Sequence, residues 1–97
     1  MNVSERDAYY DQLVDAVERG DLTWGEAIRG LRKDVAGLNQ AQFAAMTKLS
    51  VRTLRNLETN TANPTVATLE AALRPFGLAL TICRRRSHRD EGGATPS

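Results

Sequence analysis

The sequence predicts a mostly α-helical fold, a compact bundle of about five helices followed by one C-terminal β-strand. Helix-start signals recur along the chain, and each is followed by apolar residues at helical spacing. Residues 38–58 divide into two short helical patterns separated by a tight turn. At residues 78–83 the period changes to the alternation that is typical of a strand.

The composition is that of one small globular domain. The chain has 97 residues, of which 41% are hydrophobic and 26% are charged, both ordinary values. No apolar run approaches the length needed to span a membrane, and the start Met-Asn-Val-Ser-Glu-Arg-Asp is too polar for a signal peptide. The single cysteine, Cys83, excludes an intrachain disulfide. We therefore expect a cytoplasmic protein with no membrane partner.

The net charge of +1 conceals an uneven distribution. Residues 1–24 carry six acidic and two basic residues, whereas residues 25–89 carry eleven basic and four acidic residues. The basic part coincides with the turn-containing segment, which favours binding to nucleic-acid phosphates. The alternative is that these basic residues only solvate the surface.

Residues 4–19 predict an acidic amphipathic helix. Ser4 and Asp7 have the spacing of a capping pair, and Gly20 is a typical helix end. The apolar positions on or beside one face are Tyr9, Tyr10, Leu13, Val14, Ala16 and Val17. We expect this helix to pack on the domain or across a dimer, with a surface for a second protein as the alternative.

A second helix is predicted from Thr23 to about Ala36. Thr23 and Glu26 form a capping box, and Gly37 ends the helix. Its inward positions are Ile28, Leu31 and Val35. We interpret Trp24 as a core or interface anchor, because base-stacking platforms need further aromatic residues that are missing here.

The most informative segment is residues 38–58. Two helices are predicted at roughly 40–47 and 51–58, with Asn39 and Ser50 as N-caps. The residues pointing inward after the turn are Leu49, Leu54 and Leu57. The residues left on the outer face or near the start of the second helix are Val51, Arg52, Arg55 and Asn56.

This ordered set resembles the phage-repressor (Xre/Cro) helix-turn-helix family. The match continues through Asn63-Pro64-Thr65-Val66-Ala67-Thr68-Leu69-Glu70 to Phe76-Gly77-Leu78 and covers roughly residues 25–78. The resemblance implies a helix-turn-helix bundle whose helix 51–58 enters the DNA major groove. The DNA-binding residues that we expect are Gln40, Lys48, Ser50, Val51, Arg52, Thr53, Arg55 and Asn56. A plain helical bundle with the same leucine spacing is the alternative.

Each of these positions has an expected role. Arg52 can bind guanine, Asn56 can pair with adenine, and Val51 can pack on a thymine methyl group. Phosphate contacts are expected from Lys48, Thr53 and Arg55, although Arg55 can equally be a solvated charge. The resemblance implies that Gln40 touches the DNA backbone and braces the second helix of the motif.

One residue of the motif, Lys48, departs from the family pattern, and the partner of another, Glu58, is not decided by the sequence. Lys48 occupies a turn position where glycine is usual, because the backbone there favours positive φ. The resemblance implies that Glu58 pairs with a basic residue of an earlier helix, and both Arg32 and Lys33 are suitable. The choice stays open because the segment before Gly37 is one residue longer than the common spacing.

A last helix is predicted to begin at Pro64 and Thr65. Its inward positions are Val66, Leu69, Leu73 and Phe76. Pro75 lacks an N–H, so the helix must kink or end near Arg74, and Gly77 breaks it fully.

The segment 78–83 predicts the strand, with Leu78, Leu80 and Ile82 alternating with smaller or polar residues. A single strand cannot satisfy its own backbone, so pairing with a second copy about a two-fold axis is expected. The segment is similar to the C-terminal strand of Hip-type antitoxins, which implies dimerisation through these three residues. The expected organisation is an acidic extension at 1–24, a DNA-binding domain at 25–77, this strand, and a disordered tail at 84–97.

No metal-ligand cluster, phosphate-binding glycine loop or activated nucleophile is evident, so we expect no catalytic residue, no cofactor and no enzyme. The leading hypothesis is a homodimeric, nucleoid-associated repressor that binds a palindromic operator in double-stranded DNA and regulates its own operon. A refinement makes it the antitoxin of a toxin–antitoxin operon, with a toxin as partner. The alternative is a protein-interaction module with the same fold that does not bind DNA by itself.

Overall fold

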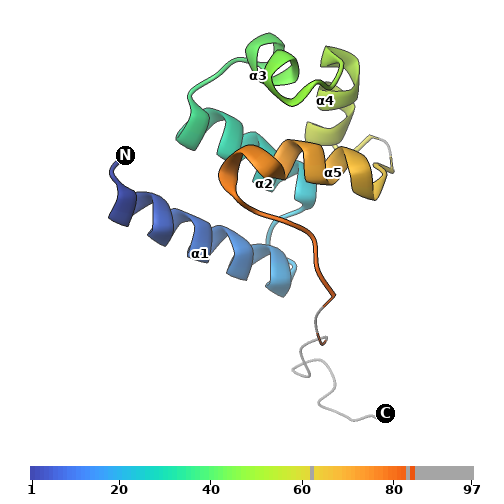
Figure 1. Ribbon diagram of the computed structural model, residues 1–97. Coiled ribbons are helices and arrows are strands. Elements are labelled where there is room, and N and C mark those ends of the chain that lie inside the picture. Colours follow the sequence, from blue (N-terminus) through green and yellow to red (C-terminus); the bar gives the residue numbers. More distant parts are fainter. Residues whose placement is uncertain (62, 83, 85–97) are drawn as a thin grey trace.

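Helices dominate the computed structural model, which describes residues 1–61, 63–82 and 84 (Figure 1). The elements are α1 (Val3–Arg19), α2 (Trp24–Gly30), the π-helical turn η1 (Leu31–Ala36), α3 (Gln40–Thr47), α4 (Val51–Glu58), α5 (Val66–Leu73) and the 3₁₀ turn η2 (Arg74–Phe76). The five α-helices in this part of the chain confirm the predicted mostly α architecture. None of its helices is long and apolar enough to cross a membrane.

A polar side chain caps the N-terminus of every α-helix in the described residues, each accepting a hydrogen bond from a first-turn amide. The predicted capping box of Thr23 and Glu26 is confirmed, as are the caps Asn39 and Ser50. The start predicted for the first helix is wrong. Asn2, rather than Ser4, caps α1, because its side-chain oxygen accepts from the Glu5 amide while the Glu5 carboxylate accepts from the Asn2 amide.

The main core lies between α2, α3, α4 and α5. It consists of the buried residues Ile28, Phe43, Ala44, Leu54, Leu57, Leu69 and Ala72. Phe43 stacks on Phe76, with ring centroids 5.9 Å apart. The inward position predicted for Val66 is wrong: its residue is 63% exposed, because the buried face of α5 begins one turn later at Leu69.

The second helix widens into η1 before it ends at Gly37. A π-helical turn holds one residue more than the corresponding α-helical turn. A π-helical turn before Gly37 is thus a physical means of taking up the extra residue that the family resemblance implies there. In a regular α-helix, by contrast, one inserted residue would rotate the side chains before it by about 100° about the helix axis relative to those after it.

The end of α5 follows the proline prediction. The α-helix stops at Leu73, and η2 carries Pro75 before Gly77 takes a positive φ of 72°. The amide of Leu78 then donates to the carbonyl of Leu73 at 3.3 Å, which closes the helix end.

Residues 78–82 show no strand in this single copy. Leu78 and Leu80 are half-buried against the bundle, whereas Ala79 and Thr81 are exposed, so burial alternates over residues 78–81. Ile82, predicted to share the face of Leu78 and Leu80, is 98% exposed in this single copy. Pairing across a dimer needs a second chain and stays a prediction. The predicted roles of Cys83 and of the tail, apart from Arg84, lie outside the described residues.

Helix α1 lies along the outside of α2, at the other end of the bundle from α3 and α4 (Figure 1). Leu13 joins Ala27 and Leu31 in a second apolar cluster, so α1 packs on the domain as expected. The Tyr9 hydroxyl also donates to Asp34 Oδ2 at 2.9 Å. Gly30 permits this approach, since a Cβ there would lie 2.7 Å from the Tyr9 oxygen.

Burial, the hydrogen bond to Asp34 and the charge of Asp34 together raise the pKa of Tyr9 from 10.0 to about 12. We predict that Tyr9→Phe lowers the free energy of unfolding by about 0.5–1.5 kcal/mol at pH 8, because the hydrogen bond is lost. The stabilisation from neutral Tyr9 is complete below pH 10 and is lost as the pH rises to about 12. Urea unfolding should therefore show a smaller difference in the free energy of unfolding between wild type and Tyr9→Phe at pH 11.5 than at pH 8. An equal difference at both pH values would contradict the stabilising role of neutral Tyr9.

Candidate nucleic-acid interface

The turn between α3 and α4 is held by local hydrogen bonds. The Leu49 amide donates to the Ala44 carbonyl at 3.0 Å, and the Ser50 hydroxyl accepts from the Thr53 amide at 2.9 Å. Lys48 has a φ of 63°, as its glycine-like position predicted. A left-handed residue other than glycine costs about 1–2 kcal/mol, so this turn stores strain.

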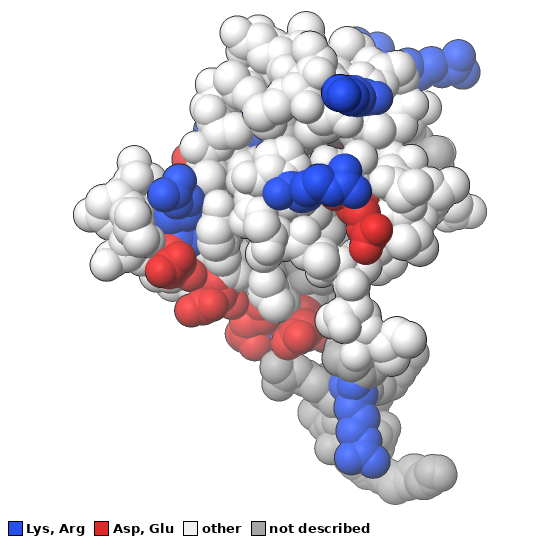
Figure 2. All heavy atoms as spheres, in the orientation of Figure 1, with Lys and Arg blue, Asp and Glu red and all other residues white. Residues whose placement is uncertain are grey.

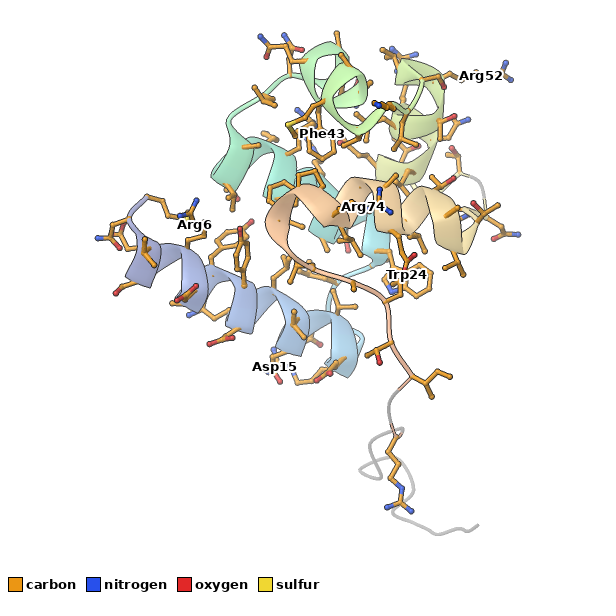
Figure 3. All side chains as sticks on the ribbon, viewed as in Figure 1. Arg6, Asp15, Trp24, Phe43, Arg52 and Arg74 are labelled. Atoms are coloured by element: carbon orange, nitrogen blue, oxygen red, sulfur yellow. The ribbon has the colours of Figure 1, made fainter. Side chains whose placement is uncertain are left out.

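The two arginines of α4 lie on its solvent face. Arg52 and Arg55 are exposed, while Leu54 and Leu57 on the opposite face are buried in the core. Figure 3 shows the Arg52 side chain extending away from the body of the protein, far from Asp15 on α1. Lys48, in the preceding turn, is also exposed.

Other predicted DNA-binding residues are more enclosed than the sequence suggested. Val51 packs partly against the main core, so only part of its side chain faces outward. Asn56 is half-buried, and its side-chain oxygen accepts from the Thr61 hydroxyl at 3.4 Å. Thr53 is half-buried and its hydroxyl accepts from the Ser50 hydroxyl at 2.8 Å. The last two contacts hold these side chains in defined positions at the surface of α4.

Gln40 connects the two motif helices. It is the first residue of α3, and its side-chain NH₂ donates to Glu58 Oε1 at 3.1 Å, at the end of α4. The bracing role implied by the family resemblance is therefore confirmed. The DNA-backbone contact of Gln40 stays a prediction.

A buried ion pair anchors the end of α4. Arg32 donates from Nε to Glu58 Oε2 at 2.7 Å and from Nη2 to Glu58 Oε1 at 2.9 Å. The side chains are 10% and 2% exposed, respectively. Arg32 also donates to the Leu38 carbonyl at 2.9 Å. The partner left open by the sequence is thus Arg32, while Lys33 is exposed.

The acidic and basic residues, which lie in different parts of the sequence, also lie on different parts of the folded surface. Figure 2 shows acidic side chains in a row along α1, whereas the charged side chains visible over α3 and α4 are basic. A negatively charged ligand is therefore favoured at α3 and α4. Among the described residues, no group of three His, Cys, Asp or Glu is placed to hold a metal ion.

One part of this surface was missed by sequence reasoning. A hollow of about 180 Å³ beside α4 brings Thr53 and Asn56 next to the start of α5, at Pro64, Thr65 and Thr68. The Thr65 cap of α5 is readable in the sequence, but its position beside α4 depends on the folded loop between them. The surface available to a ligand thus extends from α4 to the start of α5.

We predict that Glu58→Leu lowers the free energy of unfolding by about 3–5 kcal/mol, since Arg32 would remain buried without its partner. The double variant Arg32→Met/Glu58→Leu should recover much of this loss, because neither charge is then buried. Urea denaturation followed by circular dichroism measures these two variants and the single variant Arg32→Met. A double variant whose loss of stability equals the sum of the losses in the two single variants would contradict this energetic coupling.

We predict that Lys48→Gly raises the free energy of unfolding by about 0.5–1 kcal/mol, because relief of the left-handed strain exceeds the entropy cost of glycine. Lys48→Ala is the matched control, since it removes the same charge and keeps the Cβ atom that causes the strain. Thermal and urea unfolding should rank glycine above both lysine and alanine. Equal stability of the glycine and alanine variants would argue against strain in the turn.

A family model described as helix-turn-helix matches residues 28–82, which is more than half of the chain. The match includes α3, the turn, α4 and α5, and it leaves α1 outside. Searches of curated proteins and of solved structures gave no significant match. The chain therefore belongs to the helix-turn-helix family of phage-repressor-like (Xre/Cro-type) DNA-binding regulators.

Proposed function

We propose that this protein is a transcriptional repressor that binds a palindromic operator as a homodimer and reads bases through α4. The observation that carries the proposal is the exposure of Arg52 and Arg55 on a helix whose other face is fixed in the core. A positively charged, rigidly mounted helix suits the major groove, which admits an α-helix. Base contacts then give sequence selectivity.

The base-reading roles follow from the positions on α4. Arg52, the second residue of the helix, has two donors that can bind guanine O6 and N7. Asn56 lies one turn later, and its amide oxygen has a second lone pair to accept from adenine N6 while the NH₂ donates to N7. The outward part of Val51 can contact a thymine methyl group.

Phosphate contacts position the protein on the duplex. Lys48 in the turn and Arg55 on α4 are exposed, and the first amides of α3 are available to an anion. Gln40 uses one side-chain N–H for Glu58 and retains a second for a phosphate oxygen. A phosphate bound there would be connected through Glu58 to the end of α4.

The dimer is proposed from the segment 78–82, with Leu78, Leu80 and Ile82 as its contact residues. A two-fold dimer can place two recognition helices about 34 Å apart, one turn of DNA, which is why the operator is proposed to be palindromic. Occupation of a promoter is sufficient for repression, including repression of the protein's own operon. An antitoxin role, with a toxin contacting α1 or the tail, is an extension of this proposal.

The test is fluorescence-anisotropy binding to DNA from upstream of the protein's own gene and to scrambled DNA, over a range of salt concentrations. Wild type should bind the upstream DNA selectively and less tightly as salt increases. Arg52→Ala should lose about 5- to 150-fold in selectivity, equivalent to about 1–3 kcal/mol for a bidentate base contact. Arg6→Ala is the matched control, because Arg6 lies on α1, far from α4 (Figure 3).

Each other outcome changes the proposal in a defined way. Equal, weak binding to both DNAs would mean that the operator lies elsewhere or that a partner is required. No binding at low salt would favour the interaction-module function over the repressor. Equal losses in Arg52→Ala and Arg6→Ala would mean that α4 contributes charge without reading bases.

A further inference from the structure

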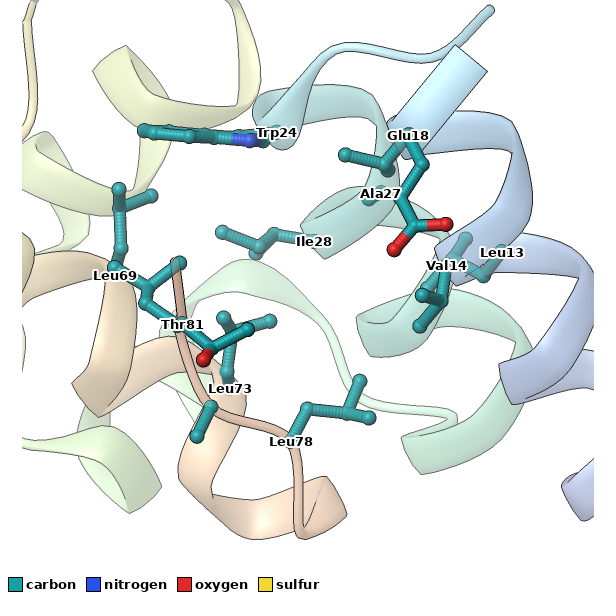
Figure 4. Close-up of a pocket in the computed structure, with 13 residues that line it drawn as sticks. Leu13, Val14, Glu18, Trp24, Ala27, Ile28, Leu69, Leu73, Leu78 and Thr81 are labelled. Atoms are coloured by element: carbon teal, nitrogen blue, oxygen red, sulfur yellow. The ribbon is translucent and has the colours of Figure 1, made fainter. Parts of the chain in front are cut away.

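An apolar groove lies on the side of the bundle formed by α1, α2, α5 and the segment after η2. It encloses about 330 Å³, and its walls include Leu13, Val14, Trp24, Ile28, Leu69 and Leu78. Figure 4 shows the Trp24 ring at one end of the hollow, with Ile28 pointing into it and Leu78 at the opposite end. Trp24 is 50% exposed. Of its two expected roles, core anchor and interface anchor, the core role is therefore wrong.

Ile82 is 98% exposed and follows directly on the stretch 78–81 that forms one wall of this groove. It has the same strand parity as Leu78 and Leu80, which both pack on the bundle. The described segment after η2 leads away from the helices toward Ile82 (Figure 1). Ile82 is therefore an apolar side chain that has no contact with the core of its own chain, although Leu78 and Leu80 at the same strand parity do.

The backbone of this segment is also open to a partner. Among the described residues 78–82, Leu78 is the one whose backbone amide donates a hydrogen bond, and its acceptor is the carbonyl of Leu73. An extended segment with free amides and carbonyls is a template for pairing with another strand. The most direct partner is the same segment in a second copy, which presents the same free groups.

We propose that Ile82 of a second copy fills this groove, in a two-fold contact centred on Leu80. In antiparallel pairing about Leu80, Ile82 of one copy stands directly opposite Leu78 of the other, on the same face. Because Leu78 forms part of the groove, this register brings Ile82 to the opening. The contact occurs twice, once for each copy, and it rests on the proposed homodimer.

Charge complementarity supports this occupant. Glu18 of the acidic helix α1 lines the groove, and the basic run Arg84, Arg85 and Arg86 follows Ile82 closely in the sequence. Insertion of Ile82 would carry the start of this run to the acidic helix of the other copy. The contact thereby gives α1, which lies outside the helix-turn-helix match, a role in dimerisation.

The first experiment measures the dimer dissociation constant by sedimentation equilibrium of the full chain, together with the fluorescence of Trp24, the only tryptophan. In wild type the Trp24 emission should shift to shorter wavelength in step with the dimer fraction. Ile82→Ser should weaken the dimer by about tenfold or more, since an apolar side chain no longer enters the groove. Val3→Ser is the matched control, because Val3 is also exposed and does not line the groove.

A complementation experiment tests the pairing of side chain and groove directly. Val14→Lys places a charged side chain at the groove while Ile82 is retained, whereas Ile82→Ser leaves the groove open. Each variant alone should dimerise weakly. A mixture should form a heterodimer that is tighter than either homodimer, because one Ile82 can still enter one open groove.

The outcomes separate this inference from the proposed function. A wild-type chain that stays monomeric at every concentration would overturn the homodimer and with it this contact. A dimer that tolerates Ile82→Ser, with unchanged Trp24 emission, would overturn the contact alone and leave the repressor proposal standing. A mixture no tighter than the two homodimers would also overturn it, and the groove would then be open to a different occupant.

Discussion

Glu58 ends α4 with a side chain that is only 2% exposed, where an unpaired carboxylate would cost several kcal/mol. Arg32 neutralises it with two hydrogen bonds, and Gln40 donates a third. These donors come from η1 and from the start of α3, so one buried charge fixes three segments relative to one another. The C-terminal end of α4 is fixed by these bonds to Glu58, and its inner face is fixed by Leu54 and Leu57 in the core. The orientation of the outer face, which carries Arg52, follows from these two constraints.

Arg32 and Lys33 both lie in the π-helical turn η1, and Arg32 is the one that reaches Glu58. In a regular helix, one additional residue would change which side chains face the core. The usual number of residues between the partner of Glu58 and Gly37 would then no longer identify that partner. A widened, π-helical last turn holds one residue more and so can absorb such an addition. Arg32 also suits the site chemically, since a planar guanidinium binds both carboxylate oxygens and Lys cannot.

The features that were predictable from the sequence are those decided within a few residues. The capping box at Thr23, the N-cap Asn39, the positive φ of Lys48 and the break at Pro75 all depend on local chemistry. The start of α1 was missed because two overlapping patterns satisfy the same rule, and the reciprocal bonds of Asn2 and Glu5 decide between them. The partial burial of Val51 and Asn56 depends on distant packing, which spacing alone does not reveal.

The acidic helix α1 is compatible with DNA binding because of where it is placed. It packs on α2, whereas α4 lies on the other side of that helix (Figure 1). Two helix-packing distances amount to about 16–20 Å, which is roughly twice the Debye length of about 8 Å at physiological salt. The negative charge of α1 is therefore largely screened at α4, the proposed recognition helix, while it remains close to the groove beside Trp24. This separation lets one small chain carry a basic surface for a polyanion and an acidic surface suited to a basic segment.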